Sequence, residues 1–372
     1  YWSGKEMGRL GELTHIANQV GHTDARDHFL GAIKDELEDW FDAGDGTDKQ
    51  FFYNSDWGTL QGYPASFHSE TQINDHQFHY GYFVQAAATI AEYDPDWAAP
   101  DQWGSMVDLL IADVANADRA NAMFPYLRSF DPYSGHSWAS GHGAFASGNN
   151  QESSSEALNF ATGVARWGAA TGQADLQDLG VYLHTIESLA VQQYWFDVDD
   201  AVFPQDYLYD GVGMIWGDGA DHRTFFSANP EMIHGINFLP VNGGSLYLGY
   251  DPAYVSAVYD EIVATRGGEP IVWQDVIWEF LALAEPDAAM AAFLGDPNYR
   301  PEEGESPAHT LHWIGNLQAM GQVERGVTAD TPFHGVFNKD GELTYVAYNP
   351  DETDLDVNFS DGTVITVPER SV

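Results

Sequence analysis

Residues 153–194, SSSEALNFATGVARWGAATGQADLQDLGVYLHTIESLAVQQY, decide the fold class of this chain. Apolar residues recur at helical spacing over 153–171 and again over 174–194, which predicts two consecutive amphipathic helices. Patterns of the same kind lie at about 10–20, 24–43, 77–93, 101–118, 242–249, 251–266, 272–284, 287–295 and 307–321. Paired helices joined by long loops predict a toroid of α/α pairs over residues 1–325. Loops of that length in a compact domain are usually functional.

Strand patterns are short and lie mainly near the end of the chain. Residues 51–67 are aromatic and interrupted by Gly and Pro, which is typical of short strands and loops. Clear two-residue alternation appears only at 343–348, 357–359 and 364–367, with Asp/Gly turns between the runs. We therefore expect a mainly α fold with a small C-terminal β-strand segment over residues 326–372.

The composition excludes several classes of partner and chemistry. The chain has 372 residues, 57 acidic and 14 basic side chains, a formal net charge of −43 and no cysteine. Such a charge repels nucleic acid and anionic lipid, and the absence of cysteine excludes disulfides, thiolate zinc sites and cysteine nucleophiles. No apolar run approaches the ~20 residues needed to span a bilayer, so a soluble protein is expected.

The acidic residues are spread along the whole chain, and lysine is rare. A surface of this kind repels itself unless salt screens it, and the Debye length falls to about 3 Å at 1 M salt. We therefore interpret the chain as a halophile's protein.

Residues 74–83, NDHQFHYGYF, form the first candidate functional stretch. They place polar and titratable groups among aromatic rings at the start of a helix. One interpretation is an Asn or Asp helix cap followed by an aromatic packing face. The other is the wall of a cleft, in which Asp75 acts as an acid because aromatic surroundings raise the pKa of its carboxyl group.

Residues 131–141, DPYSGHSWASG, form the second stretch and lead to Gly148-Asn149-Asn150. The stretch has too few aliphatic residues for a strand and too many rings for a linker. Tyr133, His136 and Trp138 on a Gly/Ser loop are typical of a platform on which sugar rings stack. An ordinary ordered loop is the alternative.

Residues 151–156, QESSSE, form the third stretch and enter a helix. Ser and Glu are favoured at helix starts, so a purely structural role is one interpretation. Glu152 and Glu156, however, are four residues apart, and on one helix face like charges repel. A functional pair of carboxylates is the other interpretation.

Other mechanisms have weaker support. Asp75, His76 and His79, with His136 and His142, lack the usual zinc pattern of two His four residues apart and a third distant ligand. No Gly-x-Ser-x-Gly elbow, phosphate-binding loop or dinucleotide fingerprint occurs. We therefore expect neither a metal nor a cofactor.

Taken together, the three stretches resemble glycoside hydrolase family 81, the endo-β-1,3-glucanases or laminarinases. Residues 74–83 are similar to the acid-bearing segment of that family, with Gln77 where a His is common. Residues 128–139 and 148–156 are similarly close, as are 226–231, 233–237 and 345–350. The resemblance covers most of the chain, and several long motifs follow one another in the family's order.

This resemblance implies an (α/α)6 barrel preceded by an N-terminal β-sandwich and a small linking domain; no counterpart of the sandwich is found in this chain. It also implies hydrolysis of internal β-1,3-glucosidic bonds with inversion. Asp75 matches the general acid, Glu152 the general base and Glu156 a second, assisting carboxylate. Inversion needs the acid and the base about 6.5–9.5 Å apart, which leaves room for the attacking water.

The glucan-binding candidates are polar and aromatic residues of the same stretches, namely Asn74, His79, Tyr82, Asp131, Tyr133, His136 and Trp138, with Trp216, Asn229 and Glu231 as further candidates. The expected partner is a β-1,3-glucan of the laminarin or curdlan type. We expect a monomer, and a polymeric substrate implies an extracellular, secreted enzyme, although no leader is recognisable at the start of the chain. The alternatives are a non-catalytic β-glucan-binding protein on the same barrel and an inverting hydrolase of another polysaccharide.

Overall fold

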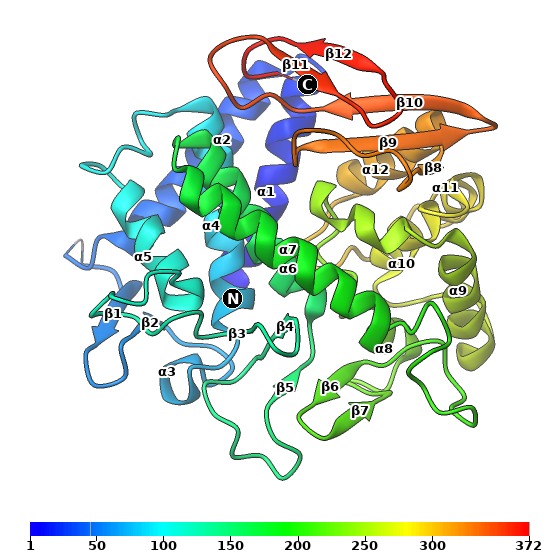
Figure 1. Ribbon diagram of the computed structural model, residues 1–372, viewed down its shortest axis with the longest axis horizontal. Helices are drawn as coiled ribbons and strands as arrows, with labels where there is room; N and C mark the ends of the chain where they lie inside the picture. The colour runs from blue at the N-terminus through cyan, green and yellow to red at the C-terminus, as the bar shows by residue number, and fades with distance from the viewer. Residues whose placement is uncertain (45, 372) are drawn as a thin grey trace. The chain divides into compact units, whose positions relative to one another are not determined.

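The computed structural model describes residues 1–44 and 46–371, and most of its regular structure is helical (Figure 1). The chain forms two compact units, each with its own internal contacts. Unit 1 comprises Tyr1–Tyr207 and Gly211–Ala228, and unit 2 comprises Leu208–Asp210 and Asn229–Val372. Among the described residues, every helix is too short or too polar to cross a bilayer.

Unit 1 holds most of the long helices. Its elements are α1 (Trp2–Gln19), α2 (Thr23–Phe41), β1 (Gln50–Asn54), β2 (Thr59–Tyr63), α3 (Ser69–Gln72), α4 (His76–Tyr93), α5 (Gly104–Ala115), β3 (Phe130–Asp131), β4 (His136–Ser137), β5 (Asn150–Gln151), α6 (Ser154–Ala170), α7 (Ala174–Tyr194), β6 (Met214–Trp216) and β7 (Gly219–Asp221). The long helices predicted from apolar spacing are confirmed, with ends that differ by a few residues.

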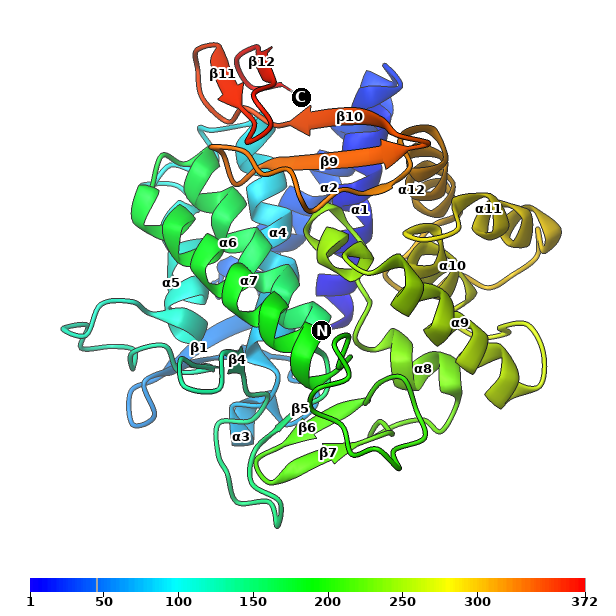
Figure 2. The same cartoon turned by 45° about the vertical axis from the view of Figure 1, so that its right-hand side comes forward.

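Helices α4 and α6 form the centre of unit 1 and lie side by side (Figures 1 and 2). Nearly every residue of α4 and most of α6 are buried, since α1, α2 and α5 cover α4 and α7 covers α6. Glycines allow this close packing. A Cβ on Gly81 would lie 3.1 Å from the Cα of Phe160, and one on Gly180 would lie 2.3 Å from the backbone nitrogen of Ala165.

Three small antiparallel sheets border the helices of unit 1. The pairs are β1 with β2 and β3 with β4, and a three-stranded sheet has the order β5-β6-β7. In that sheet, Gln151 is opposite Ile215. No strand was predicted between residues 196 and 230, so β6 and β7 were missed. Strands of three residues are too short to show a two-residue alternation.

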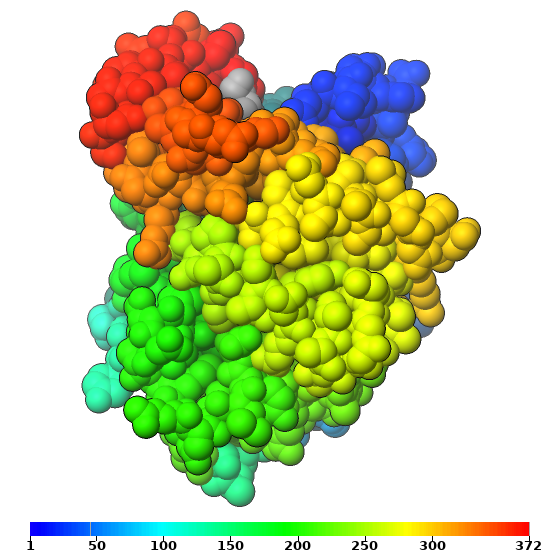
Figure 3. All heavy atoms as spheres, turned by 90° about the vertical axis from the view of Figure 1, so that its right-hand side faces the viewer, coloured from blue at the N-terminus to red at the C-terminus, as the bar shows by residue number. Residues whose placement is uncertain are grey.

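Unit 2 begins with helices and ends with strands. Its elements are α8 (Pro230–Gly235), the 3-10 helix η1 (Gly243–Gly249), α9 (Pro252–Arg266), α10 (Gln274–Ala282), α11 (Pro286–Gly295), α12 (Pro307–Met320), β8 (Gln322–Val323), β9 (His334–Lys339), β10 (Glu342–Ala347), β11 (Leu355–Asn358) and β12 (Val364–Val367). Figure 3 shows the outer surface of its segments at about residues 250–300 in yellow and of its C-terminal strands in orange to red.

The strands of unit 2 form one sheet of order β10-β9-β8 and a separate β11-β12 pair. They enclose a small core of Val336, Ala347, Val357, Phe359 and Val367. The three predicted strand runs correspond to β10, β11 and β12, whereas β8 and β9 were not predicted. The division at residues 325 and 326 stays a prediction.

Candidate active site

Asp75 precedes the first residue of α4 in a left-handed conformation with φ 61°. Such a conformation costs a non-glycine residue about 1–3 kcal/mol, so the surrounding structure must hold it. The Asp75 backbone N–H donates to Ala139 O (2.8 Å), and its carbonyl accepts from His79 N (2.9 Å). The carboxyl group makes no capping hydrogen bond, and the residue as a whole is half-buried. The side chain is therefore not used as a helix cap, which was the structural interpretation of this stretch.

Glu156 lies in the first turn of α6 and is buried, with 2% exposure. Its Oε1 accepts hydrogen bonds from the hydroxyl groups of Tyr82 (2.8 Å) and Tyr1 (3.1 Å). Glu152 is partly exposed, and its Oε1 accepts from the backbone N–H of Phe225 (2.7 Å).

The expectation that Glu152 and Glu156 share one helix was wrong. Helix α6 begins at Ser154, with Ser153 as its cap residue. The two residues before Glu152 belong to strand β5, whose pairing with β6 keeps the chain extended there. Glu152 consequently reaches the site from the end of a strand, and Glu156 reaches it from a helix.

The carboxyl groups of Asp75, Glu152 and Glu156 interact electrostatically. Burial, followed by the charges of Glu156 and Glu152, raises the pKa of Asp75 well above 3.8. Burial also raises the pKa of Glu152 from 4.5 to about 7; the Phe225 N–H lowers it and the Glu156 charge raises it. The protonated form of Asp75 is therefore favoured, and Glu152 exchanges its proton near neutral pH. Coupled carboxyl groups with raised proton affinities are suited to general acid–base chemistry.

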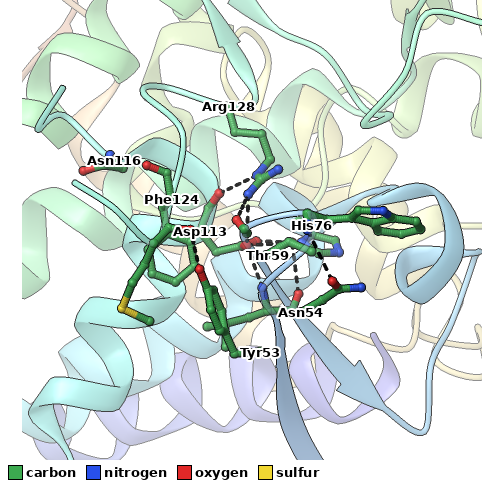
Figure 4. Close-up of polar contacts among 12 residues, drawn as sticks. Tyr53, Asn54, Thr59, His76, Asp113, Asn116, Phe124 and Arg128 are labelled. Carbon is green, nitrogen blue, oxygen red and sulfur yellow. Dashed lines mark hydrogen bonds and ion pairs between the residues drawn. The ribbon is translucent and has the colours of Figure 1, made fainter. Parts of the chain in front are cut away.

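A buried network holds the backbone beside Asp75, and sequence reasoning missed it (Figure 4). Asp113 of α5 is fully buried and accepts hydrogen bonds from the hydroxyl of Thr59 (2.7 Å), the N–H of Leu60 (2.8 Å) and Nδ1 of His76 (2.6 Å). Its backbone carbonyl accepts from Nε of Arg128 (3.0 Å). Because His76 directly follows Asp75, this network anchors the left-handed backbone of Asp75.

The other ring nitrogen of His76, Nε2, lies 3.0 Å from the carbonyl oxygen of Ser69. Both ring nitrogens thus lie within hydrogen-bond distance of an oxygen atom, so the ring is held from two sides. Asp113 lies within an apolar helix pattern, and nothing in that local pattern indicates which distant residues it contacts.

A second buried acidic residue, Glu187, holds the chain next to Glu152. Glu187 of α7 accepts from the backbone N–H (2.9 Å) and the hydroxyl (2.7 Å) of Ser137. Gln151 donates from Nε2 to the same hydroxyl (2.6 Å). Because Gln151 precedes Glu152, these contacts connect the 131–141 loop to the residue that leads into the predicted base.

The predicted aromatic platform is partly exposed. Tyr133 is 98% exposed and Trp138 is partly exposed. Asp131 accepts from Tyr133 N (2.9 Å) and Ser134 Oγ (2.8 Å), so it shapes the loop that carries both rings. His136 is buried, and its ring packs edge-on against Trp138 at a centroid distance of 4.6 Å. It therefore helps to hold the Trp138 ring in place.

Three candidates belong to α4 or directly precede it. Asn74 donates from Nδ2 to Phe67 O (3.0 Å). His79 is buried, and burial lowers its pKa well below 6.5, so the ring is neutral. Tyr82 was expected to contact glucan, but its ring is only 1% exposed, since α1 packs against it at Gly4 and Gly8, and its hydroxyl binds Glu156. Its contact is with a predicted catalytic carboxylate.

The further candidates are divided between the two units. Trp216 of β6 donates to Asp221 (2.9 Å) and lies edge-on to Phe225, whose N–H binds Glu152. Asn229 and Glu231 belong to unit 2. Asn229 is the cap residue of α8, and Glu231 is fully buried in an ion pair with Arg266. That pairing favours a structural role for Glu231.

Comparisons of the sequence and the structure with known proteins all point to the same family. A family model described as the glycosyl hydrolase family 81 C-terminal domain matches residues 1–313. A glucan endo-1,3-beta-D-glucosidase of Thermobifida fusca is 51% identical over 370 residues, covering 99% of this chain and 49% of that protein. One of Acetivibrio thermocellus is 49% identical over 374 residues, covering 100% of this chain and 48% of that protein.

A solved structure of a glycoside hydrolase family 81 mutant from Clostridium thermocellum superposes with a TM-score of 0.97. It is 48% identical and covers 100% of this chain and 52% of its own. The chain thus spans about half the length of the curated relatives it matches.

Proposed function

The chain belongs to glycoside hydrolase family 81, and from this premise we propose that it hydrolyses internal β-1,3-glucosidic bonds of a β-1,3-glucan with inversion. The observation that carries the proposal is the interacting group of Asp75, Glu152 and Glu156, in which the pKa of Asp75 is raised well above its usual value and that of Glu152 to about 7. An inverting glycosidase needs two carboxyl groups that hold their protons differently.

In the proposed reaction, Asp75 is the general acid. Its proton passes to the glycosidic oxygen as the bond between that oxygen and the anomeric carbon breaks. A water molecule attacks the anomeric carbon from the opposite face, and Glu152 accepts the proton that this water loses. Glu152 is partly exposed, so water can reach it, and the Phe225 N–H holds its carboxylate in place.

Glu156 acts on Glu152 through its charge. The two hydroxyl groups that donate to Glu156 hold its carboxyl group in place, and its negative charge raises the proton affinity of Glu152. Glu152 consequently becomes a stronger base. Tyr82 is thereby a positioning residue for Glu156.

The glucan would bind along the exposed aromatic and polar side chains near these carboxyl groups. Tyr133 and Trp138 provide accessible rings for stacking on pyranose faces, and Asn74, Asp131 and Trp216 provide polar or aromatic surface. His79 and His136 would contribute from buried positions by supporting neighbouring rings. Asn229 and Glu231 remain predictions from family resemblance.

The wider architecture belongs to the same proposal. Family membership supports an (α/α)6 barrel over residues 1–325 with a C-terminal β segment over 326–372. The protein would be a monomer. It would be secreted, because its glucan substrate is a polymer, and it would act in a salty medium, because its net charge is −43.

The proposal is tested by following the anomeric proton signal by NMR during digestion of laminarin. We expect release of α-configured reducing ends from internal cleavage. Asp75→Asn and Glu152→Gln should each lower kcat by several orders of magnitude, whereas the exposed control Glu6→Gln should retain it. Binding of laminarin without new reducing ends would favour a non-catalytic glucan-binding protein, and cleavage of cellulose or chitosan instead would reassign the substrate.

A further inference from the structure

Unit 2 contains a buried group of acidic residues and one histidine, none of which takes part in the proposed hydrolysis. Glu279 belongs to α10, Glu305 to the segment before α12, and His309 to the first turn of α12. Their exposures are 0%, 4% and 4%. The helices α10, α11 and α12 that carry or border this group pack against one another (Figure 2).

The three side chains direct ligand atoms toward one point. One such atom from each residue lies within 4.8 Å of the others. Nδ1 of His309 is 2.6 Å from Oε2 of Glu305 and 3.7 Å from Oε1 of Glu279. Two ligands of a tetrahedral cation with bonds of about 2.0 Å are about 3.3 Å apart. The 3.7 Å contact to Glu279 is close to that separation, whereas the 2.6 Å contact to Glu305 is a hydrogen bond that a bound cation would replace.

Glu279 supplies the independent observation. Within residues 1–44 and 46–371, neither of its carboxylate oxygens has a hydrogen-bond partner, although both are fully buried. The hydroxyl of the neighbouring Thr310 donates to the Ser306 carbonyl (3.1 Å), and its proximity to Glu279 lowers the pKa of that carboxyl group. The charged side chain that contacts Glu279 is His309 at 3.7 Å. A carboxylate buried with so little compensation is costly, so a further group of opposite charge or a bound proton must compensate it.

The protein itself offers little positive charge to this group. In the part of the chain that the structure describes, no Lys or Arg forms an ion pair with Asp275, Glu279 or Glu305. Asp275 is also fully buried and accepts from the Glu302 N–H (2.8 Å), which adds a further acidic side chain beside the group. His309 is the single basic side chain that contacts Glu279 there.

We propose that Glu279, Glu305 and His309 bind a divalent first-row cation, Zn²⁺ or Mn²⁺, that ties α10 to the start of α12. Two carboxylates and one imidazole are a donor set that these cations accept, whereas Ca²⁺ and Mg²⁺ favour oxygen ligands throughout. The cation neutralises the buried carboxylates, and the role is structural because none of its three ligands takes part in the proposed hydrolysis.

A proton on Glu279 is the competing explanation. Burial, followed by the charge of Glu305, raises the pKa of Glu279 well above 4.5, which would keep the carboxyl group neutral without a cation. The Glu279→Gln variant separates the two explanations. The amide mimics a protonated carboxyl group in shape and charge, but it is a poor ligand for either metal.

The test uses the full-length protein, purified in high salt and loaded in separate samples with Zn²⁺ alone, Mn²⁺ alone or Ca²⁺ alone. After dialysis, mass spectrometry of the metal content should find about one Zn²⁺ or Mn²⁺ per chain. Chelation should lower the melting temperature by about 5 °C or more. Glu279→Gln should lose both the metal and the response to chelator, whereas the exposed control Glu303→Gln in the same segment should keep both.

Three results would overturn the proposal: retention of Ca²⁺ alone, no retained metal with a melting temperature indifferent to chelator, or a Glu279→Gln variant as stable as the loaded wild type. If Glu279→Gln does not fold, the metal content and the chelator response of the wild type still decide the question. Laminarin hydrolysis is not the readout, so a failure here is distinct from a failure of the proposed function.

Discussion

The Asp113→Ala substitution tests whether the network behind His76 positions the proposed acid. It removes the acceptor of three buried donors, on Thr59, Leu60 and His76, at distances of 2.6–2.8 Å. Deleting one partner of a buried ionic group typically costs about 3–5 kcal/mol of unfolding free energy. Once His76 is released, the left-handed conformation of Asp75 loses part of its support.

The expected loss of activity is larger than that of the same Asp→Ala change elsewhere on α5. A displacement of a catalytic group by about 1 Å can cost about 10²-fold, so we expect kcat on laminarin to fall by about that factor with a smaller change in KM. Asp108→Ala is the matched control. Its carboxylate accepts from Trp167 (2.9 Å) and Gln173 (3.1 Å), and its loss should cost about 1–2 kcal/mol without affecting kcat.

The assay combines urea unfolding with reducing-end release at a temperature where both variants remain folded. The ratio of kcat between the variants, corrected for the folded fraction, isolates the positioning effect. If Asp113→Ala loses stability as expected but retains wild-type kcat, the network contributes to folding alone and the reasoning is refuted.

Four further outcomes are expected. The acidic limb of the kcat/KM–pH profile should lie near pH 7, because Glu152 must lose its proton to act as a base. Glu156→Gln should move that limb to lower pH, because it removes a neighbouring negative charge. A limb that stays in place would contradict the electrostatic coupling of Glu152 and Glu156. Tyr82→Phe, which removes the 2.8 Å hydrogen bond to Glu156, should lower kcat about tenfold and stability by about 1–2 kcal/mol in urea unfolding, and an unchanged kcat would remove its positioning role. Burial raises the pKa of Glu187 from 4.5 to about 7, so the folded state binds this proton more tightly than the unfolded state does. Up to about 3 kcal/mol of unfolding free energy, present below pH 4.5, should therefore be lost by pH 8. In unfolding titrations, Glu187→Gln should reduce this dependence of stability on pH. Dilution from molar salt to tens of millimolar should lower the melting temperature because screening of the −43 charge fails, and an unchanged value would refute the halophilic interpretation.

Local spacing was sufficient to predict the long helices. The patterns over 153–171 and 174–194 became α6 and α7 with ends within about a residue, since a helix repeats its buried face every few residues. Strands β6 and β7 were missed because three residues contain too little repetition. The placement of Glu152 outside α6 was also missed. It depends on the pairing of Gln151 with Ile215, two residues that are 64 positions apart in the chain.

Residue types and their order along the chain were enough to identify the family and to name Asp75, Glu152 and Glu156. Whether these three carboxyl groups share a site depends on the packing of α4 against α6 and on the β5–β6 pairing. The partners of Asp113 lie 37 to 54 residues away, and the contact between Glu279 and His309 joins two helices separated by a third. Hydrophobic periodicity records only that a position is buried, whereas the neighbours that charge or desolvate a carboxyl group are brought to it by chain segments far away in sequence. The residue types of the proposed site could therefore be read from the sequence, whereas the raised pKa values on which their proposed acid and base roles depend arise only in the folded protein.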